Sequence, residues 1–82
     1  MSSLSKERVQ AEAKLGALKR EIANKAIEVD MYIHTIREEA SPFLSIDEID
    51  IVRIKIAVSN LESTCAYIEE KSKEVRRLEK LL

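Results

Sequence analysis

The sequence is poor in the residues that interrupt helices. Its 82 residues include one glycine, one proline, no tryptophan and only three other aromatic residues. A multi-stranded sheet needs frequent turns, and glycine and proline supply most of them. The composition therefore predicts a single all-α domain.

Features of secreted and membrane proteins are also missing. The single cysteine, Cys65, cannot form a disulfide within the chain, and no apolar leader follows the first residues. The apolar runs are only a few residues long, whereas spanning a bilayer takes about 20 residues. We expect a cytoplasmic protein that does not enter a membrane.

No pattern of catalytic or cofactor-binding residues is present. Glycine-rich phosphate loops and metal-ligand spacings are absent from the sequence. The single histidine, His34, lies on a different arm from Cys65, and Cys65 falls at a heptad core position, where a free cysteine acts as a small buried hydrophobe. We expect no enzymatic activity, no metal and no cofactor.

The only proline lies in a corner, residues 41–49, between two arms of nearly equal length. Pro42 disfavours helix at the preceding residue, so the first helix should end near Ala40. Ser45 and Glu48 have the spacing of a capping box, which predicts that a second helix begins directly after Ser45. The predicted elements are a first helix at about 3–40, a corner at 41–45 and a second helix at about 46–82.

Apolar residues recur every three or four residues in both arms, as on one face of a helix. Equal arms joined by a short corner predict an antiparallel hairpin. A further apolar stripe on the first arm is predicted to lie beside the main one, and it comprises Val9, Ala13, Gly16, Ala23, Ile27 and Met31. The residues predicted to form the core of the hairpin and of its dimer are Leu15, Leu18, Ile22, Val29, Ile33, Ile36, Ile51, Ile54, Val58, Leu61, Cys65, Ile68 and Val75.

Two alternatives stay open from the sequence. Residues 49–58 are rich in β-branched side chains and partly alternate, which is a strand signal. Gly16 costs about 1 kcal/mol relative to alanine inside a helix, so it either is tolerated or interrupts the first helix.

A hairpin of this composition is not expected to stay alone. Two helices share one seam, and small chains without disulfides or metals commonly oligomerise. We expect a homodimer in the form of a four-helix bundle with coiled-coil-like packing. Residues 1–25, 26–50 and 51–82 carry net charges of +3, −6 and +2, so antiparallel hairpins would bring acidic and basic ends together.

The favoured function is therefore a non-enzymatic interaction protein, such as an adaptor, a chaperone-like subunit or a regulator. Apolar positions that the dimer leaves uncovered would bind another protein, and the candidates are Val9, Ala13, Leu78, Leu81 and Leu82. The alternative is a nucleic-acid-binding regulator that uses basic residues near the two termini. These residues are Arg8, Lys14, Lys19, Arg20, Lys71, Lys73, Arg76, Arg77 and Lys80.

Overall fold

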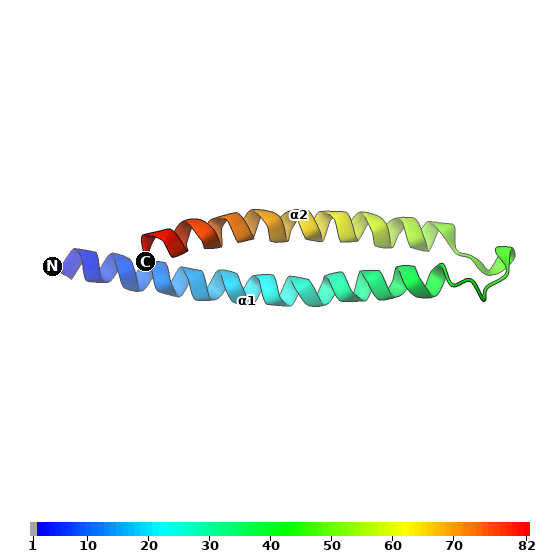
Figure 1. The fold of residues 1–82 in the computed structure, drawn as a ribbon, viewed down its shortest axis with the longest axis horizontal. Coiled ribbons are helices and arrows are strands. Elements are labelled where there is room, and N and C mark those ends of the chain that lie inside the picture. Colours follow the sequence, from blue (N-terminus) through cyan, green and yellow to red (C-terminus); the bar gives the residue numbers. More distant parts are fainter. Residues whose placement is uncertain (1) are drawn as a thin grey trace.

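The protein is an antiparallel hairpin of two long helices (Figure 1). The computed structural model describes residues 2–82, and their side chains from residue 6 onward. Helix α1 spans Ser2–Glu39, a one-turn 3-10 helix η1 spans Ile46–Glu48, and helix α2 spans Ile51–Leu81. The molecule measures 68 × 14 × 14 Å. Residues 2–82 contain no strand, so the strand alternative for residues 49–58 is wrong.

Helix α1 runs through Gly16 without a break. A Cβ atom added at Gly16 would meet only the guanidinium of Arg20, at 3.5 Å, which is an ordinary contact. Its backbone has no positive φ. Gly16 is therefore a tolerated glycine, and the predicted alternative of a broken first helix is wrong.

The bend between the helices is longer than the sequence predicts. The backbone N–H of Ser45 donates to Glu48 Oε1 at 3.3 Å, as in the predicted capping box, but the turn that follows is only η1. Ile49 and Asp50 are then extended, and Asp50 caps α2 by accepting from the N–H of Arg53 at 2.9 Å. The second helix thus begins at Ile51, and its predicted start at residue 46 is wrong because the Asp50 cap sets the start of α2.

One seam joins the two helices. Its side chains recur at three- and four-residue spacing, the period of a helix face that meets a neighbouring helix. Within the described residues, the only buried apolar side chains are Leu18, Ala57 and Leu78. The other seam residues are half-buried: Leu15, Ile22, Val29 and Ile36 on α1, and Ile54, Leu61, Ile68 and Val75 on α2.

Four residues predicted for the core lie beside the seam and not in it: Ile33, which is half-buried, and three residues of α2. Ile51, Val58 and Cys65 are exposed, with 54% exposure at Ile51 and 37% at Val58. Ala57 and Leu78 belong to the row that faces α1 instead. The row of Ala57 and Leu78 and the row of Ile51, Val58 and Cys65 border the seam line of α2 on opposite sides. Heptad spacing alone therefore does not show which of the two rows faces α1. Within one chain, Cys65 is therefore not the buried hydrophobe that the sequence predicts.

Two contacts across the seam fix the register of the helices. Arg53 Nη1 lies 3.3 Å from Glu39 Oε1 near the bend. The ammonium group of Lys25 lies 5.4 Å from the ring centre of Tyr67. Midway between these contacts, Tyr32 on α1 is level with about residues 60–61 on α2.

The burial of Leu78 near the end of α2 is testable. Leu78 is 4% exposed, whereas Leu81, one turn later, is 67% exposed. We expect Leu78→Ala to lower the free energy of unfolding by about 2–4 kcal/mol through lost burial and a cavity. The control Leu81→Ala should cost below about 0.5 kcal/mol. Urea unfolding followed by circular dichroism at one protein concentration compares them, and equal losses would contradict the seam.

The corrected start of α2 is testable as well. Asp50→Ala removes the side-chain acceptor for the Arg53 N–H and should cost about 1 kcal/mol, the usual value for a lost N-cap. Ser45→Ala affects only the single turn of η1, so its cost should be smaller. The same unfolding measurement decides, and a larger cost at Ser45 would favour the start that the sequence predicts.

Candidate functional site: an apolar flank on one side of the hairpin

Each helix has two rows of side chains that border the seam, one row on each side. On α2 the seam line is the series that starts at Ile54 and recurs every seven residues. One bordering row lies one position before each residue of that line and starts at Arg53, and the other lies four positions after and includes Val58. Lys14 Nζ lies 3.2 Å from Glu74 Oε1, and Arg53 pairs with Glu39, so these residues share one side of the hairpin. The remaining rows therefore share the opposite side.

The first side is a polar flank. Its members are Lys14, Glu21, Glu28 and Thr35 on α1, and Arg53, Asn60, Tyr67 and Glu74 on α2. Glu74 is its electrostatic centre, since it accepts from Arg77 Nε at 3.0 Å and also pairs with Lys14 of α1. Hydrogen bonds from Arg77 first, and from Lys14 second, lower the pKa of Glu74 from 4.5 to about 2. Four of the five charged members of this flank, all but Glu21, thus form ion pairs within the chain.

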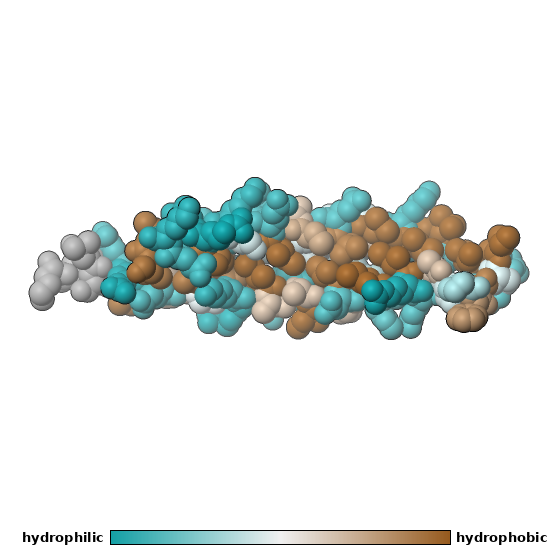
Figure 2. All heavy atoms as spheres, in the orientation of Figure 1, coloured by the Kyte–Doolittle hydropathy of each residue, from teal (hydrophilic) through white to brown (hydrophobic). Residues whose placement is uncertain are grey.

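The opposite side is an apolar flank over the half of the hairpin nearest the bend. We define the apolar flank as Ala26, Ile33 and Ala40 on α1 together with Ile51, Val58 and Cys65 on α2. All six are exposed except Ile33, which is half-buried. Figure 2 shows hydrophobic side chains gathered over the half nearest the bend, and hydrophilic side chains over α2 near its C-terminal end.

The apolar flank stops where charge begins. One heptad beyond Ala26 lies Lys19, and two heptads beyond Cys65 lies Glu79, with Ser72 between them. Lys19 Nζ and Glu79 Oε2 are 3.7 Å apart, so an ion pair across the seam closes this flank toward the termini. The flank is therefore a bounded apolar surface with small side chains among larger ones.

The further stripe predicted beside the main one lies elsewhere. Val9, Ile27 and Met31 are 61–63% exposed and lie on the outer side of α1, away from α2. The stripe is therefore not part of the seam, because its residues are rotated away from α2, and its role as a second contact face stays a prediction. At the bend, Phe43 and Ile46 are 95% and 90% exposed.

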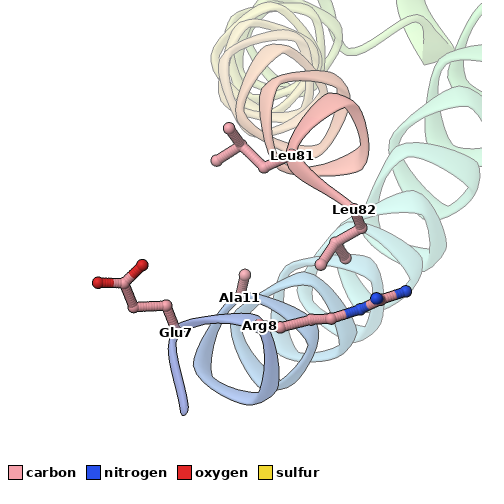
Figure 3. Close-up of a pocket in the computed structure, with 5 residues that line it drawn as sticks. All are labelled: Glu7, Arg8, Ala11, Leu81 and Leu82. Carbon is pink, nitrogen blue, oxygen red and sulfur yellow. The ribbon is translucent and has the colours of Figure 1, made fainter. Parts of the chain in front are cut away.

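A shallow groove lies where α2 ends against α1 (Figure 3). Its lining consists of Glu7, Arg8 and Ala11 from α1 and Leu81 and Leu82 from α2. Leu81 and Leu82 are exposed, as expected for candidates that could bind a partner. Leu78, predicted as another uncovered position, is buried in the seam, so that prediction is wrong.

The predicted basic patch is dispersed and largely paired. Five of its nine residues form ion pairs with glutamates: Arg8 with Glu12, Lys14 and Arg77 with Glu74, Lys19 with Glu79, and Lys73 with Glu70. The ammonium of Lys71 lies 5.3 Å from the ring centre of Tyr67. Lys14 and Lys19 lie on opposite flanks. Paired, scattered cations attract a phosphate backbone less than a continuous stripe does, and nucleic-acid binding stays a prediction.

Among the described residues, no three of the His, Cys, Asp and Glu side chains lie together as potential metal ligands. His34 pairs with Glu38 one turn away, with 2.9 Å between Nε2 and Oε1. Neither of the two described long helices has a stretch apolar enough to cross a bilayer.

Comparison with known proteins yields no relative: no family model, no curated protein and no solved structure matches this chain. The surface of the hairpin is therefore the basis for inferring its function.

Sequence reasoning found the members of the apolar flank only in part. Ile33, Ile51, Val58 and Cys65 were expected as core residues, and Ala26 and Ala40 belonged to the apolar periodicity of the first arm. Their grouping on one side depends on which rows the seam covers. The signal in the sequence was the charge of residues such as Arg53 and Glu74, which marks the rows on the other side of the seam as polar.

The ion pairs of Glu74 predict a response to acid. Because its pKa in the folded chain is about 2, below the ordinary 4.5, Glu74 stabilises the fold above pH 4.5, and this contribution is lost as the pH falls toward 2. Glu74→Gln should flatten the fall in melting temperature over that window. Glu62→Gln, at an exposed position on α2, is the control, and identical profiles for wild type and Glu74→Gln would contradict the prediction.

Proposed function

We propose that this protein is a non-enzymatic helical interaction module that acts as a homodimer, in which two hairpins pack through their apolar flanks into a four-helix bundle. The observation that carries the proposal is the difference between the two flanks. The polar flank has four of its five charged side chains in ion pairs within the chain, whereas the apolar flank exposes Ile51, Val58 and Cys65 beside Ala26 and Ala40.

The energetics of the single hairpin support association. Only Leu18, Ala57 and Leu78 are buried among the described apolar side chains, although α1 alone has 38 residues. Burying apolar surface contributes about 25 cal/mol per Å², and a lone pair of helices buries little of it. A second copy on the apolar flank adds a second contact surface to every seam residue that borders it.

The shape of the flank also suits a helix partner. On α1 the small Ala26 and Ala40 lie on either side of the larger Ile33, and on α2 the side chains become smaller from Ile51 through Val58 to Cys65. Alternation of large and small side chains lets facing helices interdigitate. The dimer would cover Cys65, which would then take the buried role expected of a free cysteine.

In this proposal, the surfaces that remain outside the bundle serve a further partner. Val9 on α1 and the groove formed with Leu81 and Leu82 lie near the termini, away from the apolar flank. An amphipathic partner segment would bind such a surface through apolar anchors at helical spacing. This assigns self-association to the half near the bend, and adaptor or regulator contacts to the other half.

The proposal predicts a homodimer in solution, and it predicts that one charge introduced into the apolar flank prevents the dimer from forming. Sedimentation equilibrium at micromolar concentrations should give twice the 9.4 kDa chain mass. Val58→Glu places a carboxylate in the apolar interface, where burying an unpaired charge is costly, so it should give the monomer mass.

The matched control is Ile27→Glu. Ile27 is 61% exposed on the outer side of α1, so its substitution should leave the dimer intact. Circular dichroism shows whether each variant keeps its helices. A wild-type monomer at these concentrations would refute self-association, and equal loss of the dimer in both variants would refute the assignment to the apolar flank.

A further inference from the structure

Charged residues border the apolar flank, and the sign of their charge changes along each helix. Each follows a flank position by one helical turn, so it lies at the outer edge of that flank. On α1 the edge carries Asp30 and then Arg37, and on α2 it carries Lys55, Glu62 and Glu69. A second copy bound to this flank therefore meets a pattern of charges as well as an apolar surface.

Two hairpins can face each other in two directions. If both point the same way, α1 of one copy lies over α2 of the other at the same level. The register set by the Arg53–Glu39 and Lys25–Tyr67 contacts then brings Arg37 level with Lys55, and Asp30 level with Glu62. Like charges meet at both places, which opposes this arrangement.

We infer that the second copy binds in the opposite direction and staggered, with the twofold axis level with Tyr32 and Leu61. Helix α1 then lies over α1, and α2 over α2. The arrangement rests on the self-association proposed above, and it specifies the direction and register of that dimer. It overlaps the halves near the two bends, where the apolar flank is, and leaves the halves near the termini outside the bundle.

The apolar side chains match in this register. Residues equally far from the axis on either side meet across it. Val58 of one copy comes within about one residue of the level of Cys65 of the second copy, and Ile51 comes equally close to the level of Ser72. The two Ile33 side chains lie beside each other near the axis. Each large side chain thus faces a smaller one, except at the centre.

The charged edges match as well. Lys55 of one copy lies within one helical turn of the level of Glu69 of the second copy. Arg37 lies within a turn of the level of Asp30. Lys and Arg side chains reach across such an offset, so opposite charges meet away from the axis on both α1 and α2, whereas at the axis Glu62 of each copy lies within two residues of the level of its counterpart.

A third charge contact involves the acidic bend. Lys19, at the terminal limit of the apolar flank, lies within one turn of the level of Asp47 of the second copy. Full overlap of the two α1 helices would instead bring Cys65 level with about Glu79 and set apolar flank against charged surface. The staggered register sets larger side chains of α2 against smaller ones and forms more opposite-charge than like-charge contacts.

Disulfide trapping tests this register with the cysteine that the chain already has. In Val58→Cys, the new thiol and Cys65 are seven residues apart in one helix, about 10 Å, which is too far for a bond within the chain. In the staggered antiparallel dimer the two thiols meet across the interface. Mild oxidation with diamide should therefore convert Val58→Cys to a covalent dimer on non-reducing gels.

Two controls share the same chemistry. The wild type should stay largely uncross-linked, because its two Cys65 residues are offset by about 12 Å along α2 in this register. Glu79→Cys should also stay uncross-linked, since residue 79 meets Cys65 when the two α1 helices overlap over their full length and not in the staggered register. Cross-linking of either control in preference to Val58→Cys overturns the staggered register.

Sedimentation of reduced Val58→Cys separates the possible failures. A reduced dimer that does not cross-link overturns the arrangement and leaves self-association standing. A reduced monomer, with wild type also monomeric, overturns the proposed function itself. If only the variant is monomeric, substitutions of the edge charges Arg37 and Asp30 determine the direction of the dimer.

Reversing one edge charge gives the direction independently of cysteine. In the antiparallel dimer, the carboxylate introduced by Arg37→Glu lies near Asp30 of the second copy, so the dimer dissociation constant should rise. The double variant Asp30→Arg with Arg37→Glu restores the opposite charges and should return the dissociation constant to its wild-type value. In the parallel dimer the same carboxylate faces Lys55 and lowers the dissociation constant. Tighter association of Arg37→Glu therefore overturns the inference.

Discussion

A single seam between two long helices is the constraint on which the rest of this structure depends. Each seam residue has neighbours on one side only, so Leu18, Ala57 and Leu78 are the only buried apolar residues in the described chain. A fold with so thin a core has little apolar burial to offset the entropy of ordering its residues. The surfaces that border the seam consequently decide both the stability of the chain and what it binds.

The two flanks of the seam differ in chemistry: one carries paired charges and the other exposes apolar side chains. On one side, Glu74 joins Lys14 and Arg77, and Arg53 joins Glu39, so charged groups are matched inside the chain. Such exposed pairs contribute modestly and are screened by salt. On the other side, Val58 and Cys65 are exposed with no compensating polar contacts. Burial of that side requires another molecule, and the partner proposed here is a second copy of the chain.

The bend contributes by setting where the helices begin and how they align. Asp50 caps α2 five residues later than the Ser45 capping box suggests, and the Ser45–Glu48 contact closes only one turn. The hydrogen bond from Ser45 lowers the pKa of Glu48, so this acid belongs to the negative end of the hairpin. In the proposed dimer, this register brings the basic residues of the terminal half within reach of the acidic bend of the second copy.

The sequence by itself determined the two helices, their antiparallel pairing and the place of the bend, because apolar spacing, one proline and cap residues are local signals. It also identified Leu18, Leu61 and Val75 as residues that face the seam. The tertiary structure alone decided which row beside the seam line turns toward α1. Ala57 and Leu78 took that place and left Ile51, Val58 and Cys65 outside, since a small rotation of α2 exchanges rows of equal spacing, and only the contacts of Lys14, Lys25 and Glu39 across the seam fix it.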